Sequence, residues 1–309
     1  MRYDSYAQYG RKYKLTISSP KTGIGFEVSD LRISFQVEKK AKGSGNNAAI
    51  LVYNVTPDSV GAIHEGDKVY LEAGYENGNY GLIYSGDIVQ VYLARDDDVD
   101  TAMTIMCQDA DVFLTKSIVC STIGAGATAD EILNTCIGDS DDVSRGDITP
   151  RLSQSLLPRG KVLFGRSAEY VEQLAKSNQS QLFIENGTIN IVASDEYDAN
   201  TAVELSPTTG LLGTPDQTKT GVKAKCLINS SMRINTLVHI DKQYINVMQN
   251  TKGNAKKNIE LNTTGLYKII SLTYKGDTRG NNWYCEFEAD SVSGKYVSSI
   301  TSKDASIWG

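Results

Sequence analysis

Apolar and polar residues alternate through the first third of the chain, and this alternation constrains the fold more than any other feature. It runs through residues 13–19, 26–37, 48–55, 67–75, 82–94 and 101–110. A period of two is typical of half-buried β-strands. Turn clusters such as KTGIG, KGSGNN, HEGD and ENGNYG separate these segments. Six strands at this spacing predict a closed or nearly closed antiparallel barrel or sandwich.

One short segment of this first third has the pattern of a helical turn. In residues 56–62, Thr56 is placed to cap the turn and Pro57 occupies the first helical position.

The middle of the chain has a different pattern. Residues 127–137 and 167–178 predict amphipathic helices. In the second helix, Ser167 is the expected N-cap, and the residues on one face are Ala168, Val171, Leu174 and Ala175. Asn186 and Gly187 separate the apolar runs 181–184 and 188–192, which is a strong signal for a hairpin. We therefore expect a small helix-plus-hairpin module here.

The last third returns to β-structure. Strands are predicted at residues 221–228, 236–240, 266–274 and 282–292, with residues 276–280 as a hairpin loop between the last two. Residues 249–262 are polar and rich in Lys and Asn, and they predict a mobile loop. The residues after Gly294 predict a flexible or partner-docking end. The expected fold is mainly β (α+β), divided at residues 1–112, 113–200 and 201–309.

Charge and cysteine content narrow the functional classes. The net charge is −6, and an acidic chain is poorly suited to gripping nucleic acid, because phosphate binding needs a basic surface. The five cysteines form no CxxC pair, so they predict small buried residues in a reduced compartment rather than zinc or redox chemistry. No apolar stretch approaches the about 18 residues of a membrane helix, and the N-terminus lacks the apolar region of a signal peptide.

No motif of a known catalytic or metal site is present. The two histidines, His64 and His239, belong to no HExxH pattern, and no GxSxG occurs. The acidic run from Asp96 to Asp100 lacks the Gly and the terminal Glu of a calcium loop. Gly124 and Gly126 precede a predicted helix but lack the third glycine of a phosphate cradle. We therefore expect no catalytic residue, no metal and no cofactor.

Three stretches together resemble the baseplate hub proteins of contractile-tailed phages. The first is EGDKVYLEAGYENGNYGLIYSGDIVQV followed by MTIMCQDADVFL, and the second is LFGRSAEYVEQLAKSNQSQLFIENGTINIV. The third joins GLLGTPDQTKTGVKAKCLINSSMRINTLVHI to GLYKIISLTYKGDTRGNNWYCEFEA, whose KGDTRGNNW end is the most specific element. The resemblance covers residues 11–292.

This resemblance implies a structural protein that carries two tail-tube-like antiparallel β-barrels and the helix-plus-hairpin module. Three copies would present six barrels in a ring, which matches a sixfold tube to a threefold spike. The implied partners are the tail tube or a distal tube-like baseplate protein, the central spike, and the tape-measure and wedge proteins. DNA would pass through without specific binding. The implied location is the virion tail baseplate, with synthesis in the host cytoplasm.

The hub motifs also supply candidate signature and interface residues, namely Gly66, Asp67, Gly74, Tyr75, Gly86, Asp87, Gly276, Asp277, Arg279, Gly280 and Trp283. Asp277 and Arg279 form either an interface pair or the closure of their own hairpin. The aromatic residues of the predicted strands either pack across strands or anchor subunit contacts; they are Tyr80, Tyr84, Tyr92, Tyr267, Tyr274, Trp283 and Tyr284.

Two other functions remain as alternatives. A receptor- or glycan-binding β module of a virion or cell surface would expose an aromatic patch. A peptidoglycan hydrolase would need two carboxyl groups that meet in space, and such a pair leaves no sequence pattern.

Overall fold

The structure is a computed structural model, and it describes residues 8–20, 23, 25–41, 45–95, 101–138, 140, 142–193, 196–246 and 264–292. The predicted loop at residues 249–262, the end after Gly294 and the acidic run at residues 96–100 lie outside these ranges. Among the described residues, no helix is long and apolar enough to span a membrane.

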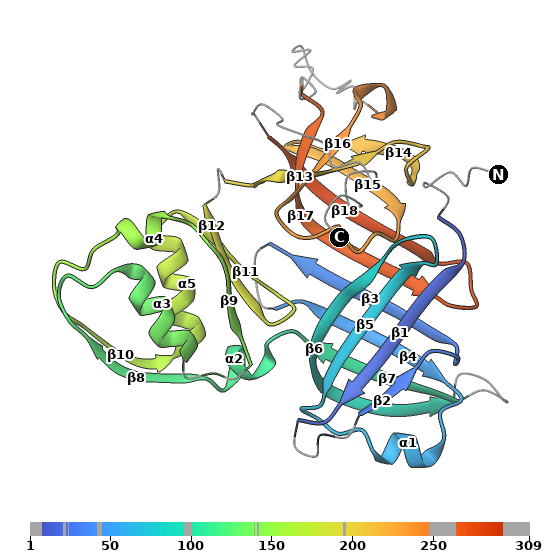
Figure 1. The fold of residues 1–309 in the computed structure, drawn as a ribbon, viewed down its shortest axis with the longest axis horizontal. Helices are drawn as coiled ribbons and strands as arrows, with labels where there is room; N and C mark the ends of the chain where they lie inside the picture. The colour runs from blue at the N-terminus through green and yellow to red at the C-terminus, as the bar shows by residue number, and fades with distance from the viewer. Residues whose placement is uncertain are drawn as a thin grey trace, which may run out of the picture.

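Strands dominate all three parts of the chain (Figure 1). The first part contains β1 (Arg11–Ser18), β2 (Gly25–Val28), β3 (Ile33–Lys40), β4 (Asn47–Tyr53), α1 (Pro57–Gly61), β5 (Lys68–Tyr75), β6 (Gly78–Arg95) and β7 (Thr101–Gln108). The middle contains α2 (Asp111–Thr115), β8 (Ile118–Ile123), α3 (Ala129–Gly138), β9 (Ser144–Ile148), α4 (Arg151–Gln154), β10 (Lys161–Arg166), α5 (Ser167–Ser177), β11 (Ser180–Glu185) and β12 (Thr188–Ala193). The last part contains β13 (Asp198–Leu205), β14 (Leu211–Gln217), β15 (Gly221–Leu227), β16 (Thr236–Ile240), the 3₁₀ turn η1 (Lys242–Tyr244), β17 (Leu266–Asp277) and β18 (Trp283–Ser291).

One continuous sheet joins the first and last parts. Its strand order is β14-β15-β18-β17-β3-β4-β7-β6-β5-β1-β2, with β16 pairing β17 and β13 pairing β16. The link between the two parts is the antiparallel pair β3–β17, whose register runs from Ser34 opposite Asp277 to Lys40 opposite Ser271. The pairs are antiparallel except β13–β16 and β9–β12. The mainly β, antiparallel prediction is therefore confirmed, whereas closure into two barrels stays a prediction.

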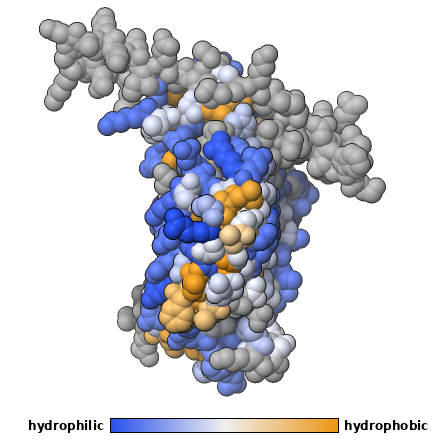
Figure 2. Space-filling model, turned by 90° about the vertical axis from the view of Figure 1, so that its left-hand side faces the viewer, coloured by the Kyte–Doolittle hydropathy of each residue, from blue (hydrophilic) through white to orange (hydrophobic). Residues whose placement is uncertain are grey.

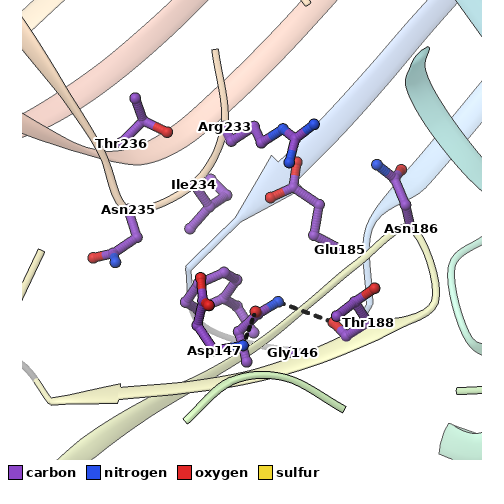
Figure 3. A pocket seen from close by; sticks show the side chains of 11 residues that line it. Gly146, Asp147, Glu185, Asn186, Thr188, Arg233, Ile234, Asn235 and Thr236 are labelled. Atoms are coloured by element: carbon purple, nitrogen blue, oxygen red, sulfur yellow. Dashed lines mark hydrogen bonds between the residues drawn. The ribbon is translucent and has the colours of Figure 1, made fainter. Parts of the chain in front are cut away.

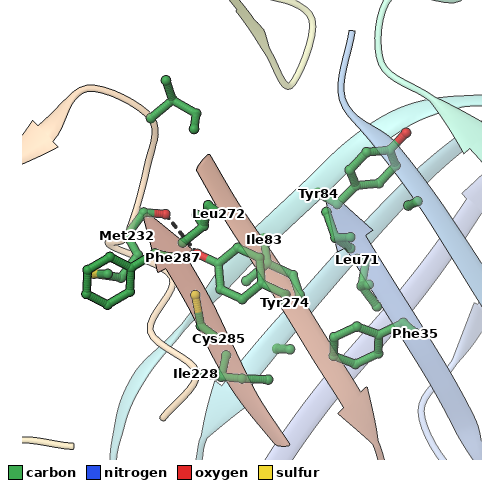
Figure 4. Packing of buried hydrophobic residues seen from close by; sticks show 14 of the residues in the cluster. Phe35, Leu71, Ile83, Tyr84, Ile228, Met232, Leu272, Tyr274, Cys285 and Phe287 are labelled. Carbon is green, nitrogen blue, oxygen red and sulfur yellow. Dashed lines mark hydrogen bonds between the residues drawn. The ribbon is translucent and has the colours of Figure 1, made fainter. Parts of the chain in front are cut away.

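The hydrophobic core crosses the β3–β17 link. Phe35, Leu71 and Tyr84 from the first part belong to the same buried cluster as Tyr274 and Phe287 from the last part (Figure 4). The middle module has its own cluster, in which Val119, Leu133, Leu163, Val171 and Ile189 are fully buried. The division at residues 112 and 200 stays a prediction, because a shared core and a separate module core are compatible with more than one division of the chain.

Several local predictions can be compared with the structure. Thr56 caps α1, since its Oγ1 accepts a hydrogen bond from the Ser59 amide at 3.3 Å. The single strand expected at residues 26–37 is wrong, because the chain bends after Val28 and forms two strands. The bend is needed because β2 pairs with β1, whereas β3 pairs with β4 and β17.

The predicted cap of the second helix is also wrong. Arg166 is the N-cap of α5, and Ser167 is its first helical residue. The Ser167 side chain is fully buried and accepts a hydrogen bond from the Ser117 hydroxyl at 3.1 Å, so it faces β8 rather than the helix end. The predicted apolar face holds, with Val171, Leu174 and Ala175 buried.

Candidate functional site

The signature residues of the last hairpin meet the first part of the chain at one place, the hairpin junction, which comprises Gly276, Asp277, Arg279, Gly280 and Trp283. Asp277 closes its own turn, since its Oδ1 accepts hydrogen bonds from the Arg279 and Gly280 amides at 2.9 and 2.8 Å. Its Oδ2 lies 2.8 Å from Arg32 Nη2. This hydrogen bond from Arg32, together with the amide hydrogen bonds, lowers the pKa of Asp277 despite partial burial. Asp277 therefore fixes both the hairpin and its attachment to the segment before β3.

Arg11 and Arg279 add contacts around the same turn. Arg11 Nη1 donates to the carbonyls of Asp277 and Gly280 at 2.9 and 2.5 Å, and its guanidinium lies 5.5 Å from the centre of the Trp283 ring. The Arg279 guanidinium donates to the Asp30 carbonyl at 3.5 Å. Within one chain, Asp277 thus closes its hairpin and pairs with Arg32, while Arg279 forms no ion pair with it.

Trp283 is the apolar centre of the junction. It is 4% exposed, packs edge-to-face on Phe35 with ring centroids 5.6 Å apart, and donates its Nε1 hydrogen to the Gly74 carbonyl at 3.3 Å. Gly276 must be glycine here, because a Cβ at this position would lie 2.2 Å from the Phe35 ring. Gly74 likewise has φ +157° and would place a Cβ 2.4 Å from the Asn79 carbonyl oxygen. Burial next to this site raises the pKa of Tyr75 to about 12.

The remaining signature residues form a second cluster, with Gly66 and Asp67 just before β5 and Gly86 and Asp87 in the middle of β6. Gly66, with φ +88°, donates its amide hydrogen to the Ile88 carbonyl, and the Ile88 amide donates to the Asp67 carbonyl, both at 2.8 Å. The Asp67 carboxylate accepts a hydrogen bond from the His64 amide at 2.8 Å. A Cβ on Gly86 would lie 2.4 Å from the Tyr84 hydroxyl. These residues shape a tight turn.

Asp87 links this cluster to the middle module. Its carboxylate lies 2.6 Å from Lys68 Nζ, and the same ammonium also binds Asp142 of the module. Burial raises the pKa of Asp87, although Lys68 opposes the shift. Asp142 also accepts a hydrogen bond from the Phe113 amide at 3.2 Å. Asp87 is therefore part of an ionic contact between the first part of the chain and the module.

Sequence reasoning missed a larger contact of the same kind, the module seam, formed by Lys39, Asn46, Asp109, Glu185 and Asn186. Lys39 Nζ lies 2.7 Å from Glu185 Oε1, and both side chains are buried. Asp109 accepts hydrogen bonds from the Asn186 and Gly187 amides at 2.6 and 2.7 Å. Asn46 donates to the Ile184 carbonyl at 2.7 Å. The tip of the β11–β12 hairpin is thus held by buried polar groups of the first part.

The seam borders a cleft of about 400 Å³ between the module and the segment before β16 (Figure 3). Figure 3 shows Arg233 directed toward Glu185, with Asn186, Thr188 and Asp147 along the opposite wall. The residues that line this cleft are mostly polar, and Phe183 and Ile234 are the large apolar residues among them. In the part of the chain that the structure describes, no three His, Cys, Asp or Glu side chains are grouped to hold a metal ion.

Burial in the seam raises the pKa of Asp109 to about 6, although the amide hydrogen bonds from Gly187 and Asn186 act in the opposite direction. Between about pH 4 and 6 the folded protein therefore binds more protons at this residue than the unfolded chain, so its contribution to the free energy of unfolding falls as the pH rises. We expect the stability of the wild type relative to Asp109→Asn to decrease from pH 4 to pH 7 in urea titrations. A difference that stays constant over this range would contradict the prediction.

The aromatic residues of the strands differ in their burial. Tyr84, Tyr267 and Tyr274 are at most 1% exposed, and Tyr274 donates to the Met232 carbonyl at 2.8 Å. Tyr92 is the exposed member of the group. His64 lies on the turn described above, and His239 Nδ1 is 3.2 Å from Glu204 Oε1. Most of these aromatic side chains therefore pack inside the molecule.

Comparison with known proteins gives one family match. The family model described as baseplate hub gp41 matches residues 15–289. No curated protein sequence matches the chain.

Solved structures with a similar fold include two tail proteins and a PdpA–VgrG complex. The 43 kDa tail protein of prophage MuSo2 from Shewanella oneidensis has a TM-score of 0.59 at 10% identity, over 91% of this chain and 98% of that chain. The tail protein from Neisseria meningitidis MC58 has a TM-score of 0.58 at 8% identity, over 91% and 97%. The half-lidded PdpA–VgrG complex of Francisella has a TM-score of 0.56 at 8% identity, over 95% and 62%. At these identities the likeness shows the fold.

Proposed function

Because the chain belongs to the baseplate hub gp41 family, we propose that it is the structural hub of a phage tail baseplate and that three copies form a pseudo-sixfold ring. In this proposal each chain supplies two barrels, one from each end of the continuous sheet. Two similar barrels per chain let three copies match a sixfold tube on one side and a threefold spike on the other.

The observation that carries the proposal is the β3–β17 pair. Its seven paired residues, together with the core that crosses it, join the two β-rich parts into one rigid unit. An adaptor between two symmetries needs its two barrels at a fixed angle, because a flexible link would let the barrels leave the ring. Arg32, Asp277 and Trp283 reinforce the same link at the hairpin junction.

The role needs no chemistry, and the buried carboxylates support this. Asp109, Asp142 and Glu185 are all engaged in contacts that hold the module to the first part. The proposed neighbours are the tail tube or a distal tube-like baseplate protein, the central spike, and the tape-measure and wedge proteins, in the tail of the virion. The net charge of −6 suits a ring through which DNA slides without specific binding.

The first test is the solution mass of the full chain by light scattering at high protein concentration. We expect a species of three times 33.7 kDa and a ring in negative-stain images. A stable dimer or tetramer would contradict the proposal. A monomer calls for the same measurement with the spike and tube proteins added, and a chain that stays monomeric with both partners would also contradict it.

A further inference from the structure

Two patches of exposed apolar side chains lie on the described part of the molecule. They contain six of the thirteen large hydrophobic residues that are exposed. The ribbon patch comprises Ile118, Val162 and Phe164, and the sheet patch comprises Val89, Tyr92 and Met106. Figure 2 faces the module end of the molecule and shows apolar side chains gathered in a stripe among hydrophilic ones. Contiguous patches of exposed apolar side chains often mark sites of interaction with other proteins.

The ribbon patch is one face of the two-stranded sheet β8–β10. The register places Phe164 opposite Cys120 and Arg166 opposite Ile118. The other face is closed, because Val119 and Leu163 are fully buried in the module core. On the open face, Ile118, Val162 and Phe164 are 64%, 67% and 75% exposed. In the described part of the chain these strands pair only with each other, so the ribbon gains no cover from a third strand.

The ribbon patch has a basic rim. Residues 116–123 and 159–166 contain Lys116, Arg159, Lys161 and Arg166 and no acidic residue. Three of these four, Lys116, Arg159 and Arg166, are exposed. Exposed basic residues beside an apolar centre favour an apolar partner surface with acidic residues beside it.

The sheet patch has exposed apolar side chains, and exposed acidic residues lie on two neighbouring segments. Gln90 lies opposite Met106 and Tyr92 opposite Thr104, on the face of β6–β7 away from the buried Met103 and Ile105. Glu65 is exposed in the turn whose Gly66 amide bonds to Ile88, next to Val89. Asp58 is exposed in α1, which follows Asn54, and the Asn54 amide bonds to the Thr101 carbonyl at the start of β7.

We propose that the ribbon patch of one copy docks on the sheet patch of a second copy of this chain. The proposal rests on the proposed hub function and names the surfaces that would join the subunits. A cyclic ring of identical chains needs two different, complementary patches on each copy. Figure 1 shows β8 and β10 at the left end of the molecule and the end of β6 with β7 at the lower right, so neither patch can satisfy the other within one chain.

The test uses two single substitutions in the full chain, Phe164→Asp in the ribbon patch and Tyr92→Asp in the sheet patch. Each places a charge at the apolar centre of one patch and leaves the other patch intact. We expect either variant to raise the concentration at half-assembly at least about thirtyfold, the effect of losing an interface hot spot. Tyr9→Asp, at an exposed apolar residue outside both patches, is the matched control and should assemble like the wild type.

Mixing the two variants gives the decisive result. Together they retain one intact ribbon patch and one intact sheet patch, so an equimolar mixture should form a one-to-one dimer of twice 33.7 kDa that grows no further. Formation of this dimer also proves that both variants are folded. Higher salt should weaken it, because the two rims carry opposite charges.

Other outcomes separate this inference from the hub function. If both variants still form the wild-type trimer, the patches are not the contact, and the inference is overturned while the hub function stands. If the mixture stays monomeric although both variants melt like the wild type, the inference is again overturned. If the wild type never assembles, even with the spike and tube proteins, the hub function itself fails.

Discussion

Replacing Lys39 by Met should lower the free energy of unfolding by about 3–5 kcal/mol, one of the two largest effects expected for a single substitution in this chain. Lys39 and Glu185 are both buried and lie 2.7 Å apart, so the substitution leaves the buried Glu185 carboxylate without the ammonium that pairs with it. Urea denaturation at pH 7, followed by circular dichroism, measures the change.

The double variant Lys39→Met, Glu185→Met is the matched control. It removes both charges and keeps similar volume, so most of the loss should be recovered. A single variant that unfolds like the wild type would show that Glu185 reaches water or another cation. A double variant as unstable as the single one would show that packing rather than charge determines the effect.

Replacing Trp283 by Ala should destabilise the protein by about 3–5 kcal/mol, because it removes a large buried ring and leaves a cavity at the hairpin junction. The ring packs on Phe35 of β3 and bonds to the Gly74 carbonyl at the end of β5, so the cavity lies between the two parts of the sheet. Thermal melting and urea denaturation both report the change.

Trp283→Phe separates packing from hydrogen bonding. It keeps an aromatic ring against Phe35 but leaves the Gly74 carbonyl without its donor, for which we expect a loss of about 1–3 kcal/mol. Equal losses for the Ala and Phe variants would mean that the hydrogen bond to Gly74, rather than the ring, holds the junction. A loss below about 1 kcal/mol for Trp283→Ala would contradict its central position.

Local patterns predicted the strands whose two faces differ and the helices with one apolar face. Residues 48–55 and 67–75 alternate cleanly, and β4 and β5 lie there. The strands β8 and β10 were missed because IVCSTI and KVLFGR carry apolar residues on both faces, one set buried and the other exposed at the ribbon patch. A strand whose outer face is also apolar shows no alternation of polar and apolar residues, whether or not a partner covers that face.

The candidate site was predictable as a set of residues but not as a set of contacts. The KGDTRGNNW motif indicated a hairpin, and Asp277 does close it. Nothing in the sequence names Arg32 as the partner of Asp277, because the two lie 245 residues apart. One residue of the module seam could have been found from the sequence. The alternation of Ile33, Phe35 and Val37 puts Lys39 on the inward face of β3. Which of the 37 acidic residues pairs with Lys39 depends on the folded arrangement of the chain.

The pairing of β3 with β17 also sets the order in which the molecule can be completed on the ribosome. β3 ends at Lys40 and β17 begins at Leu266, so the partner emerges roughly 10 to 45 s later at ordinary rates of translation. Until then one edge of β3 has no partner, and an open edge invites pairing with other nascent chains. Gln36, Glu38 and Lys40 place polar and charged groups along that strand. We expect these side chains to disfavour such pairing during synthesis, before β17 covers the edge.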